Sequence, residues 1–244
     1  RMVLAVSPSE PADRPMPKQP DYAAATERHE FSPALTERLR SEAGRRGVSL
    51  FSLLLSGFGV LMARLSGQSD FAVAVPFAGL ALADGGASMG DGVSSLPVRM
   101  RTDAALPFDE FVSHTHAALL EAADHQGLTL TAIQRMLGVR ASHGEAALTG
   151  VEFNLLPRMP SVAFEGLDHQ VRECARAAMD WDLSLNLSDS GKTLALNLHY
   201  ATVRYDASTV RRWIGFYEAL LSSVSGLGDA AARAGTRLGD IDVL

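Results

Sequence analysis

The chain has 244 residues, of which 47% are apolar and 20% are charged, and its 22 basic and 28 acidic side chains give a formal net charge of −6 at pH 7. This composition is that of a folded globular protein and excludes the collagen-like and disordered classes. No dense Lys and Arg cluster offers the basic surface from which nucleic-acid binding gets most of its affinity, so we expect no nucleic-acid partner.

A single cysteine, Cys174, can form neither an internal disulfide nor a thiolate zinc site. The longest apolar stretch, 50–65, is interrupted by serines, glycines and an arginine and is too short for a membrane span. We expect no signal peptide before it, because prolines follow the first residues directly. The sequence therefore predicts a cytoplasmic protein that contacts no membrane and binds no metal.

The first predicted elements are a linker and two helices. Residues 1–30 carry five prolines, which disfavour helices and sheet ladders and predict an extended linker typical of the middle of a longer protein. Capping residues and an apolar stripe predict a surface helix over 32–47. The segment 49–67 is apolar on nearly every side, so we expect a helix buried in the core.

The remaining elements alternate between strands and helices. They are predicted in this order: strands over 70–76 and 93–101, helices over 107–125 and 131–137, strands over 150–155, 182–187 and 193–200, and a helix over 207–224. A hairpin turn over 189–191 joins the last two strands. This mixed order, without an internal repeat, predicts an α/β (α+β) sandwich.

Local motifs for nucleophilic or acid–base catalysis are weak. Gly86, Ser88 and Gly90 fit the G-x-S-x-G pattern of a hydrolase, but that pattern requires a strand before it and a helix after it, and here a strand follows. We therefore interpret this segment as a flexible loop. None of the seven histidines has an Asp four residues later, and His114 and His116 lie on different faces of a helix.

Two positions beside predicted strands are candidates for a site. Asn154 lies in the middle of an apolar strand, where a buried amide must find partners or cost about 1 to 3 kcal/mol. Trp181 directly precedes a strand, where a tryptophan is either part of the core or lines a ligand site.

Several segments, in their order, resemble the C-terminal half of a condensation domain of nonribosomal peptide synthetases. The prolines of 11–17 resemble the strap between the two lobes of that family, and 47–55 resembles its buried helix. The segment 65–76 resembles its TGQDD-type turn and VVGTP-type strand, and 89–99 resembles its IGxFVNTLxxR motif. The strand 151–155 resembles the FN-containing strand of the family. The DLSL segment from 182, the segment 194–200 and the segment 205–210 resemble its DLTL strand, its hairpin and its final helix. The resemblance thus covers nearly the whole chain.

The sequence departs from the family pattern at four places. Ser94 and Ser95 stand where Asn and Thr are common in the IGxFVNTLxxR motif. Leu80 stands where an arginine is common, and Gly92 replaces a phenylalanine of the IGxFVNTLxxR motif. His125 and Gln126 match only the start of the HQDxPFE motif.

The resemblance implies a chloramphenicol-acetyltransferase-like lobe, a mixed β-sheet packed by helices, with 1–30 as inter-lobe linker and 31–244 as the C-terminal lobe. In that family two carrier proteins present donor and acceptor groups on phosphopantetheine arms, and the acceptor amine attacks the donor thioester to form an amide. The catalytic HHxxxDG motif belongs to the N-terminal lobe and is missing here, so we expect no catalytic residue and no directly bound cofactor in this chain. The implied partners are the N-terminal lobe and the two carrier proteins.

The resemblance also implies site residues by position. Five residues are expected to line the substrate tunnel: Ser94, Ser95, Asn154, Trp181 and Ser184. Asp182 and Arg99 are expected to brace the structure near the site. The segments 77–86 and 200–205 resemble the floor loop and the latch that reach across to the other lobe.

Two other functions stay open at this point. Two incomplete motifs, the IGxFVNTLxxR motif with Gly92 in place of phenylalanine and the HQDxPFE motif that stops after Gln126, favour a non-catalytic module that keeps a carrier-protein docking surface. A different acyltransferase of the same fold, using coenzyme A, would carry an HxxxD signature, which the sequence lacks. An epimerisation domain fits less well, because the regions of Asn154 and Asp182 resemble condensation domains.

Overall fold

The computed structural model describes residues 12–15, 17, 19, 21–78, 93–138, 148–156, 166, 174–226 and 236–241. Six strands form one sheet in the order β1 (Ala24–Glu30), β6 (Leu194–Ala201), β5 (Leu183–Asp189), β4 (Val151–Leu156), β2 (Asp70–Ala78) and β3 (Val93–Arg101). Strands β4 and β5 are parallel, as are β2 and β4, and the other neighbours are antiparallel. The predicted mixed sheet is therefore confirmed.

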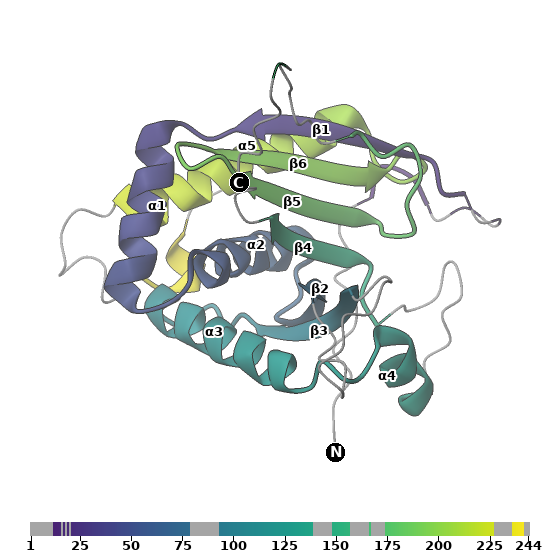
Figure 1. The fold of residues 1–244 in the computed structure, drawn as a ribbon, viewed down its shortest axis with the longest axis horizontal. Helices are drawn as coiled ribbons and strands as arrows, with labels where there is room; N and C mark the ends of the chain where they lie inside the picture. Colours follow the sequence, from purple (N-terminus) through teal and green to yellow (C-terminus); the bar gives the residue numbers. More distant parts are fainter. Residues whose placement is uncertain are drawn as a thin grey trace.

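The helices pack on this sheet and on one another (Figure 1). They are α1 (Pro33–Arg46), α2 (Leu50–Ser66), α3 (Phe108–Asp124), α4 (Leu130–Met136), α5 (Ala207–Gly226) and the short 3₁₀ helix η1 (Leu238–Asp240). Helix α2 contacts α1, α3 and α5, while α5 contacts β1 and β6, and α3 contacts β3. The predicted helices are all present in the described residues, with ends within a few residues of those expected.

Helix α2 is central because the sequence gives it defined ends and an apolar surface. The hydroxyl of Ser49 accepts a hydrogen bond from the backbone N–H of Ser52 at 3.0 Å, and Gly67 ends the helix in the left-handed conformation with φ 68°. The phenyl ring of Phe58 lies 5.6 Å from that of Phe153 on β4 and 6.3 Å from the ring of Tyr217 on α5. Aromatic contacts thus join α2 to the sheet and to the last helix.

Strand β1 differs from the prediction, which places its residues in the linker. It pairs antiparallel with β6, from Ala24 opposite Ala201 to Glu30 opposite Ala195. The five prolines of the predicted linker all precede residue 21, so they lie outside β1. Strand β1 itself is rich in charged residues, as is common in edge strands. Charge at an edge removes the apolar alternation by which a strand is recognised in a sequence, so the pattern does not reveal this strand.

The segment before β1 is anchored to the beginning of α5. The Asp13 carboxylate accepts hydrogen bonds from the backbone N–H of Asp206 at 2.7 Å and from the Thr209 hydroxyl at 2.9 Å. The backbone N–H of Arg14 donates to the Arg204 carbonyl at 3.1 Å, and the Arg14 side chain forms an ion pair with Asp206. Asp13 therefore caps a helix that lies more than 190 residues later in the chain.

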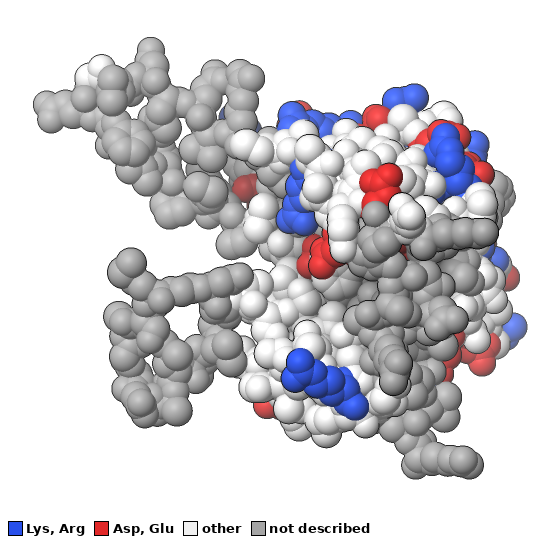
Figure 2. Space-filling model, turned by 90° about the vertical axis from the view of Figure 1, so that its right-hand side faces the viewer, with Lys and Arg blue, Asp and Glu red and all other residues white. Residues whose placement is uncertain are grey.

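Figure 2 shows charged side chains interspersed with uncharged ones, and the described Lys and Arg residues on this face do not form one extended basic patch. Among the described residues, no single helix is long and apolar enough to cross a membrane, and α1 and α2 meet that requirement only as a pair bent by 103°.

Candidate functional site: the polar face of the sheet

The two faces of the sheet differ in chemistry because strand residues alternate between them. In β5, Leu183, Leu185 and Leu187 belong to the hydrophobic core under the helices. Ser184 and Asn186 point to the other side, yet they are also buried. Buried polar side chains need hydrogen-bond partners, so this second face requires a network.

The strand register brings these polar residues into two rows that cross four strands. The first row runs from β4 to β1 through Glu152, Ser184, His199 and Thr26. The second row runs beside it through Asn154, Asn186, Asn197 and Arg28. We call these eight residues the polar face.

Hydrogen bonds join the first row to its neighbours. The Ser184 hydroxyl donates to Glu152 Oε2 at 2.7 Å and accepts from Asn186 Nδ2 at 2.9 Å. From β3, the Ser95 hydroxyl reaches the other carboxylate oxygen, Oε1, at 3.4 Å. Glu152 is thus a buried carboxylate, 8% exposed, that is held from both sides by hydroxyl groups.

His199 occupies the middle of the same row and is fully buried. Its Nδ1 lies 2.7 Å from the Thr26 hydroxyl oxygen on β1. Burial, with smaller contributions from the positive charges of Arg176 and Arg28, lowers the pKa of His199 to about 4. The imidazole is therefore neutral at physiological pH and can both donate and accept hydrogen bonds.

Three of the five residues predicted to line a tunnel lie on this surface. Ser184 and Asn154 belong to the polar face, and Ser95 extends it to β3 through Glu152. Ser94 is opposite Phe77 in the β2–β3 ladder and points to the other side of the sheet, because consecutive strand residues alternate. Trp181 is partly buried just before β5 and is not in either row.

The two residues expected to brace the structure form ion pairs. Arg204 Nη1 lies 2.6 Å from the Asp182 carboxylate, and its guanidinium also stacks 5.3 Å from the Tyr205 ring centroid. Burial raises the pKa of Asp182, although Arg204 acts in the opposite direction. Because Arg204 belongs to the segment 200–205, the pair ties the predicted latch to the start of β5.

Arg99 binds Asp70 through two parallel hydrogen bonds of 2.7 and 2.5 Å. The hydrogen bond from Arg99 is the main cause of the lowered pKa of Asp70. Such a bidentate pair fixes the relative position of β2 and β3 at the end of the ladder.

Of the eight polar-face residues, sequence reasoning identified only Asn154 and Ser184. It missed six, which are Thr26, Arg28, Glu152, Asn186, Asn197 and His199. Glu152 interrupts the apolar run of β4 two residues before Asn154, and the same argument about buried polar groups applies to both. His199 interrupts the apolar residues of β6 in the same way, but its partner Thr26 is 173 residues away and cannot be found from the sequence. The predicted floor loop lies outside the described residues except for Phe77 and Ala78, and the motif from Gly86 to Gly90 lies wholly outside them.

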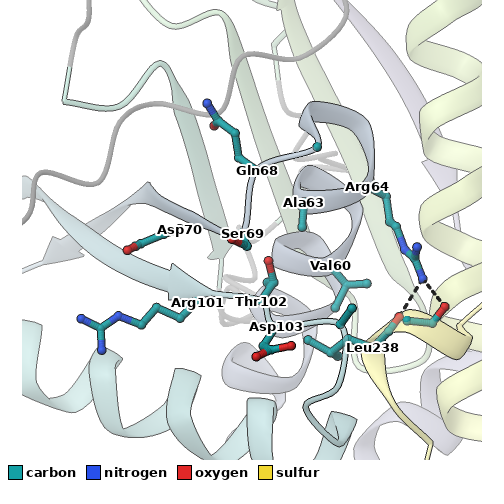
Figure 3. Close-up of a pocket in the computed structure, with 13 residues that line it drawn as sticks. Val60, Ala63, Arg64, Gln68, Ser69, Asp70, Arg101, Thr102, Asp103 and Leu238 are labelled. Carbon is teal, nitrogen blue, oxygen red and sulfur yellow. Dashed lines mark hydrogen bonds between the residues drawn. The ribbon is translucent and has the colours of Figure 1, made fainter.

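A separate open pocket of about 750 Å³ lies where α2 ends, between the start of β2, the end of β3 and η1 (Figure 3). Arg64 crosses it and donates to the carbonyl oxygens of Leu238 and Gly239, both at 2.8 Å. None of its lining residues belongs to the polar face. In the part of the chain that the structure describes, no three His, Cys, Asp or Glu side chains are arranged to hold a metal ion.

Solved structures share this arrangement of helices and mixed sheet. The X-domain from teicoplanin biosynthesis matches 99% of this chain with a TM-score of 0.84 at 21% sequence identity, and the chain covers 55% of it. A holo four-domain nonribosomal peptide synthetase bound to AMP and glycine matches 98% with a TM-score of 0.81 at 18% identity, and the chain covers 19% of it. The fold is therefore the chloramphenicol-acetyltransferase-like fold of condensation domains.

The sequence identifies the family within that class. The model of the Condensation domain matches residues 7–236, and the chain belongs to this family. Tyrocidine synthase 3 from Brevibacillus parabrevis and bacitracin synthase 2 from Bacillus licheniformis are 28% and 27% identical over 96% and 85% of the chain. The chain spans only 4% and 8% of the lengths of these two relatives.

Proposed function

We propose that the chain is the C-terminal lobe of a condensation domain that forms an amide bond between carrier-tethered acyl or aminoacyl groups. The observation that carries this proposal is the polar face, two rows of hydrogen-bonding side chains that cross four strands in a chain of the Condensation family. The substrates are carried on phosphopantetheine arms, and no cofactor is bound directly.

The polar face suits a wall along which a pantetheine arm lies. Each amide of such an arm would lose its water on entering a tunnel, at a cost of about 1 to 3 kcal/mol if no partner replaced it. Ser95 and Asn154 are half-buried, so their hydroxyl and amide groups border the accessible surface. The more deeply buried Ser184 and Asn186 are hydrogen-bonded to each other, and Ser184 also binds Glu152, which Ser95 contacts from β3.

The reaction requires groups that this chain does not contain. The acceptor amine must be oriented and freed of a proton before it attacks the thioester, and the HHxxxDG motif that serves this purpose in the family is missing from the sequence. In our proposal the N-terminal lobe supplies it. The C-terminal lobe contributes the tunnel wall, the floor loop and the latch, in a cytoplasmic enzyme that also binds donor and acceptor carrier proteins.

An intact-mass assay tests this proposal. Two loaded carrier proteins are mixed with this chain alone, with a matching N-terminal lobe alone, and with both. We expect the amide product only when both lobes are present, and its loss when the second histidine of the HHxxxDG motif is replaced by alanine. Product from this chain alone would overturn the proposed division of labour.

A non-catalytic docking module is the second candidate. It is supported by the likeness of the fold to the X-domain from teicoplanin biosynthesis and by the trimmed motifs at Gly92 and after Gln126. Measurable carrier binding without product, in the presence of both lobes, would favour this second function.

A further inference from the structure

Glu152 stands out on the polar face because a buried carboxylate is costly unless a cation compensates it. Its side chain is 8% exposed, and it forms no ion pair with any described residue. The hydrogen-bond partners described above are the hydroxyl groups of Ser95 and Ser184. Both partners are neutral, so the Glu152 carboxylate has no cationic partner among the described residues.

The geometry also leaves this carboxylate with acceptor capacity. Its two oxygens together can accept about four hydrogen bonds. Ser184 fills one position with a good bond of 2.7 Å, and Ser95 fills another with a long one of 3.4 Å. Strand β2 adds no donor side chain, because the residue in register with Glu152 is Ala74 and the next one on that face is Pro76.

The network fixes the direction of these hydrogen bonds. Asn186 donates to the Ser184 oxygen, so the single hydroxyl proton of Ser184 is available for Glu152. Glu152 is thereby held as an acceptor, oriented by β5 and bordered by the half-buried Ser95 at the accessible side. A group that binds here must bring hydrogen-bond donors, and a positively charged N–H donor forms the strongest bond with a carboxylate.

We propose that Glu152 binds the amino group of the acceptor aminoacyl substrate. This inference rests on the proposed function, in which such a substrate lies along the polar face. An aminoacyl group carries an ammonium at neutral pH, and a hydrogen bond between two charged groups is about twice as strong as a neutral one. The amide N–H groups of a pantetheine arm are neutral and would be served equally well by Ser95 or Asn154. Glu152 therefore selects an amine over an acyl group without one.

The test compares two probes on the chain combined with its N-terminal lobe. One probe is a stable amide analogue of glycyl-pantetheine, and the other is the acetyl analogue, which lacks only the amino group. Calorimetry gives the ratio of their dissociation constants. We expect the amine probe to bind about tenfold more tightly or better, since the loss of one charged hydrogen bond is of that size.

The variants separate binding from folding. Glu152→Gln keeps the shape of the side chain and can still accept from Ser184, and we expect the probe ratio to fall close to one. Ser95→Ala removes only the long hydrogen bond and should leave the lobe folded with a ratio that stays high. Ser190→Ala, in the exposed turn between β5 and β6, is the matched control. It removes hydrogen bonds within the turn and should leave the probe ratio unchanged.

Two results would overturn the inference: a folded Glu152→Gln variant that keeps the wild-type ratio, or a wild-type protein that does not distinguish the probes. Amide formation measured in the same samples keeps the two proposals apart. Wild-type amide formation with an unchanged ratio in the variant refutes the role of Glu152 alone. A ratio that depends on Glu152 in a protein without amide formation supports that role and refutes the proposed catalysis.

Discussion

The imidazole Nδ1 of His199 and the hydroxyl oxygen of Thr26 lie 2.7 Å apart across the β6–β1 ladder, where the two residues are direct partners. Burial keeps the imidazole neutral and lowers the pKa of His199 to about 4, against an ordinary value of 6.5. Below pH 6.5 the unfolded chain therefore takes up a proton that the folded chain excludes. Stability from this residue is complete above pH 6.5 and is lost as the pH falls towards 4.

We expect this loss to reach about 3 kcal/mol of unfolding free energy between pH 6.5 and 4. His199→Gln removes the titrating group and should flatten this part of the pH profile. The shifted carboxyl pKa values of Asp70 and Asp182 are shared by the wild type and the His199→Gln variant. The difference between the stability profiles of these two proteins therefore reports on His199. His114→Gln, at an exposed position, should reproduce the wild-type profile in urea titrations.

Ser184→Ala tests the network around Glu152. The change leaves the Glu152 carboxylate without its 2.7 Å hydrogen bond and Asn186 Nδ2 without its acceptor. We expect a loss of about 1 to 3 kcal/mol in unfolding free energy, because both groups stay buried. Amide formation with both lobes should fall as well. A variant as stable and as active as the wild type would show that the network has no such role.

Asp13→Ala tests the cap that reaches α5 from the beginning of the chain. Removal of the carboxylate leaves the Asp206 N–H and the Thr209 hydroxyl without this partner. A lost helix cap costs about 1 kcal/mol, which chemical denaturation can resolve. Asp21→Ala is a suitable comparison, because the one hydrogen bond of the Asp21 side chain within the described part of the chain is to the nearby Ala23 N–H, and its loss should matter less. Equal losses for the two variants would argue against a cap.

Arg99→Gln tests the bidentate pair between β2 and β3. We expect the pKa of Asp70 to rise towards its ordinary value when the guanidinium is removed, as followed by NMR. The free energy of unfolding above pH 4, where Asp70 is ionised, should fall by about 0.5 kcal/mol in the variant. The loss should be smaller in high salt, because the side chains of Arg99 and Asp70 are partly exposed. Arg211→Gln, whose partner is Glu27 on β1, is the matched control and should leave the Asp70 titration unchanged.

Most helices and strands of the fold are predictable because residues within each element, or directly beside it, indicate its type and its ends. Ser49 and Gly67 mark the ends of α2, and the alternation in β5 separates the leucines from Ser184 and Asn186. The same alternation separates Ser94 from Ser95, so only one of these neighbours can belong to the polar face. Strand β1 escapes prediction because charges at a sheet edge remove that alternation.

The site is less predictable than the fold because its residues meet only through strand pairing. Ser184 and Glu152 are 32 residues apart, and Thr26 and His199 are 173 apart. A search for catalytic spacing along the sequence cannot find such pairs. The register of a parallel and an antiparallel ladder brings them together, and that register follows from the packing of the whole sheet.

Strand β1 and the Asp13 cap determine where this chain can be cut and joined to another sequence. A graft that starts at residue 31 would discard all seven residues of β1 and expose the outer edge of β6 to pairing with other chains. One that starts at residue 21 would keep the sheet whole but strip the first turn of α5 of its cap. A protein that joins this chain to a foreign sequence should therefore place the junction upstream of residue 12, so that Asp13 keeps its hydrogen bonds to the beginning of α5.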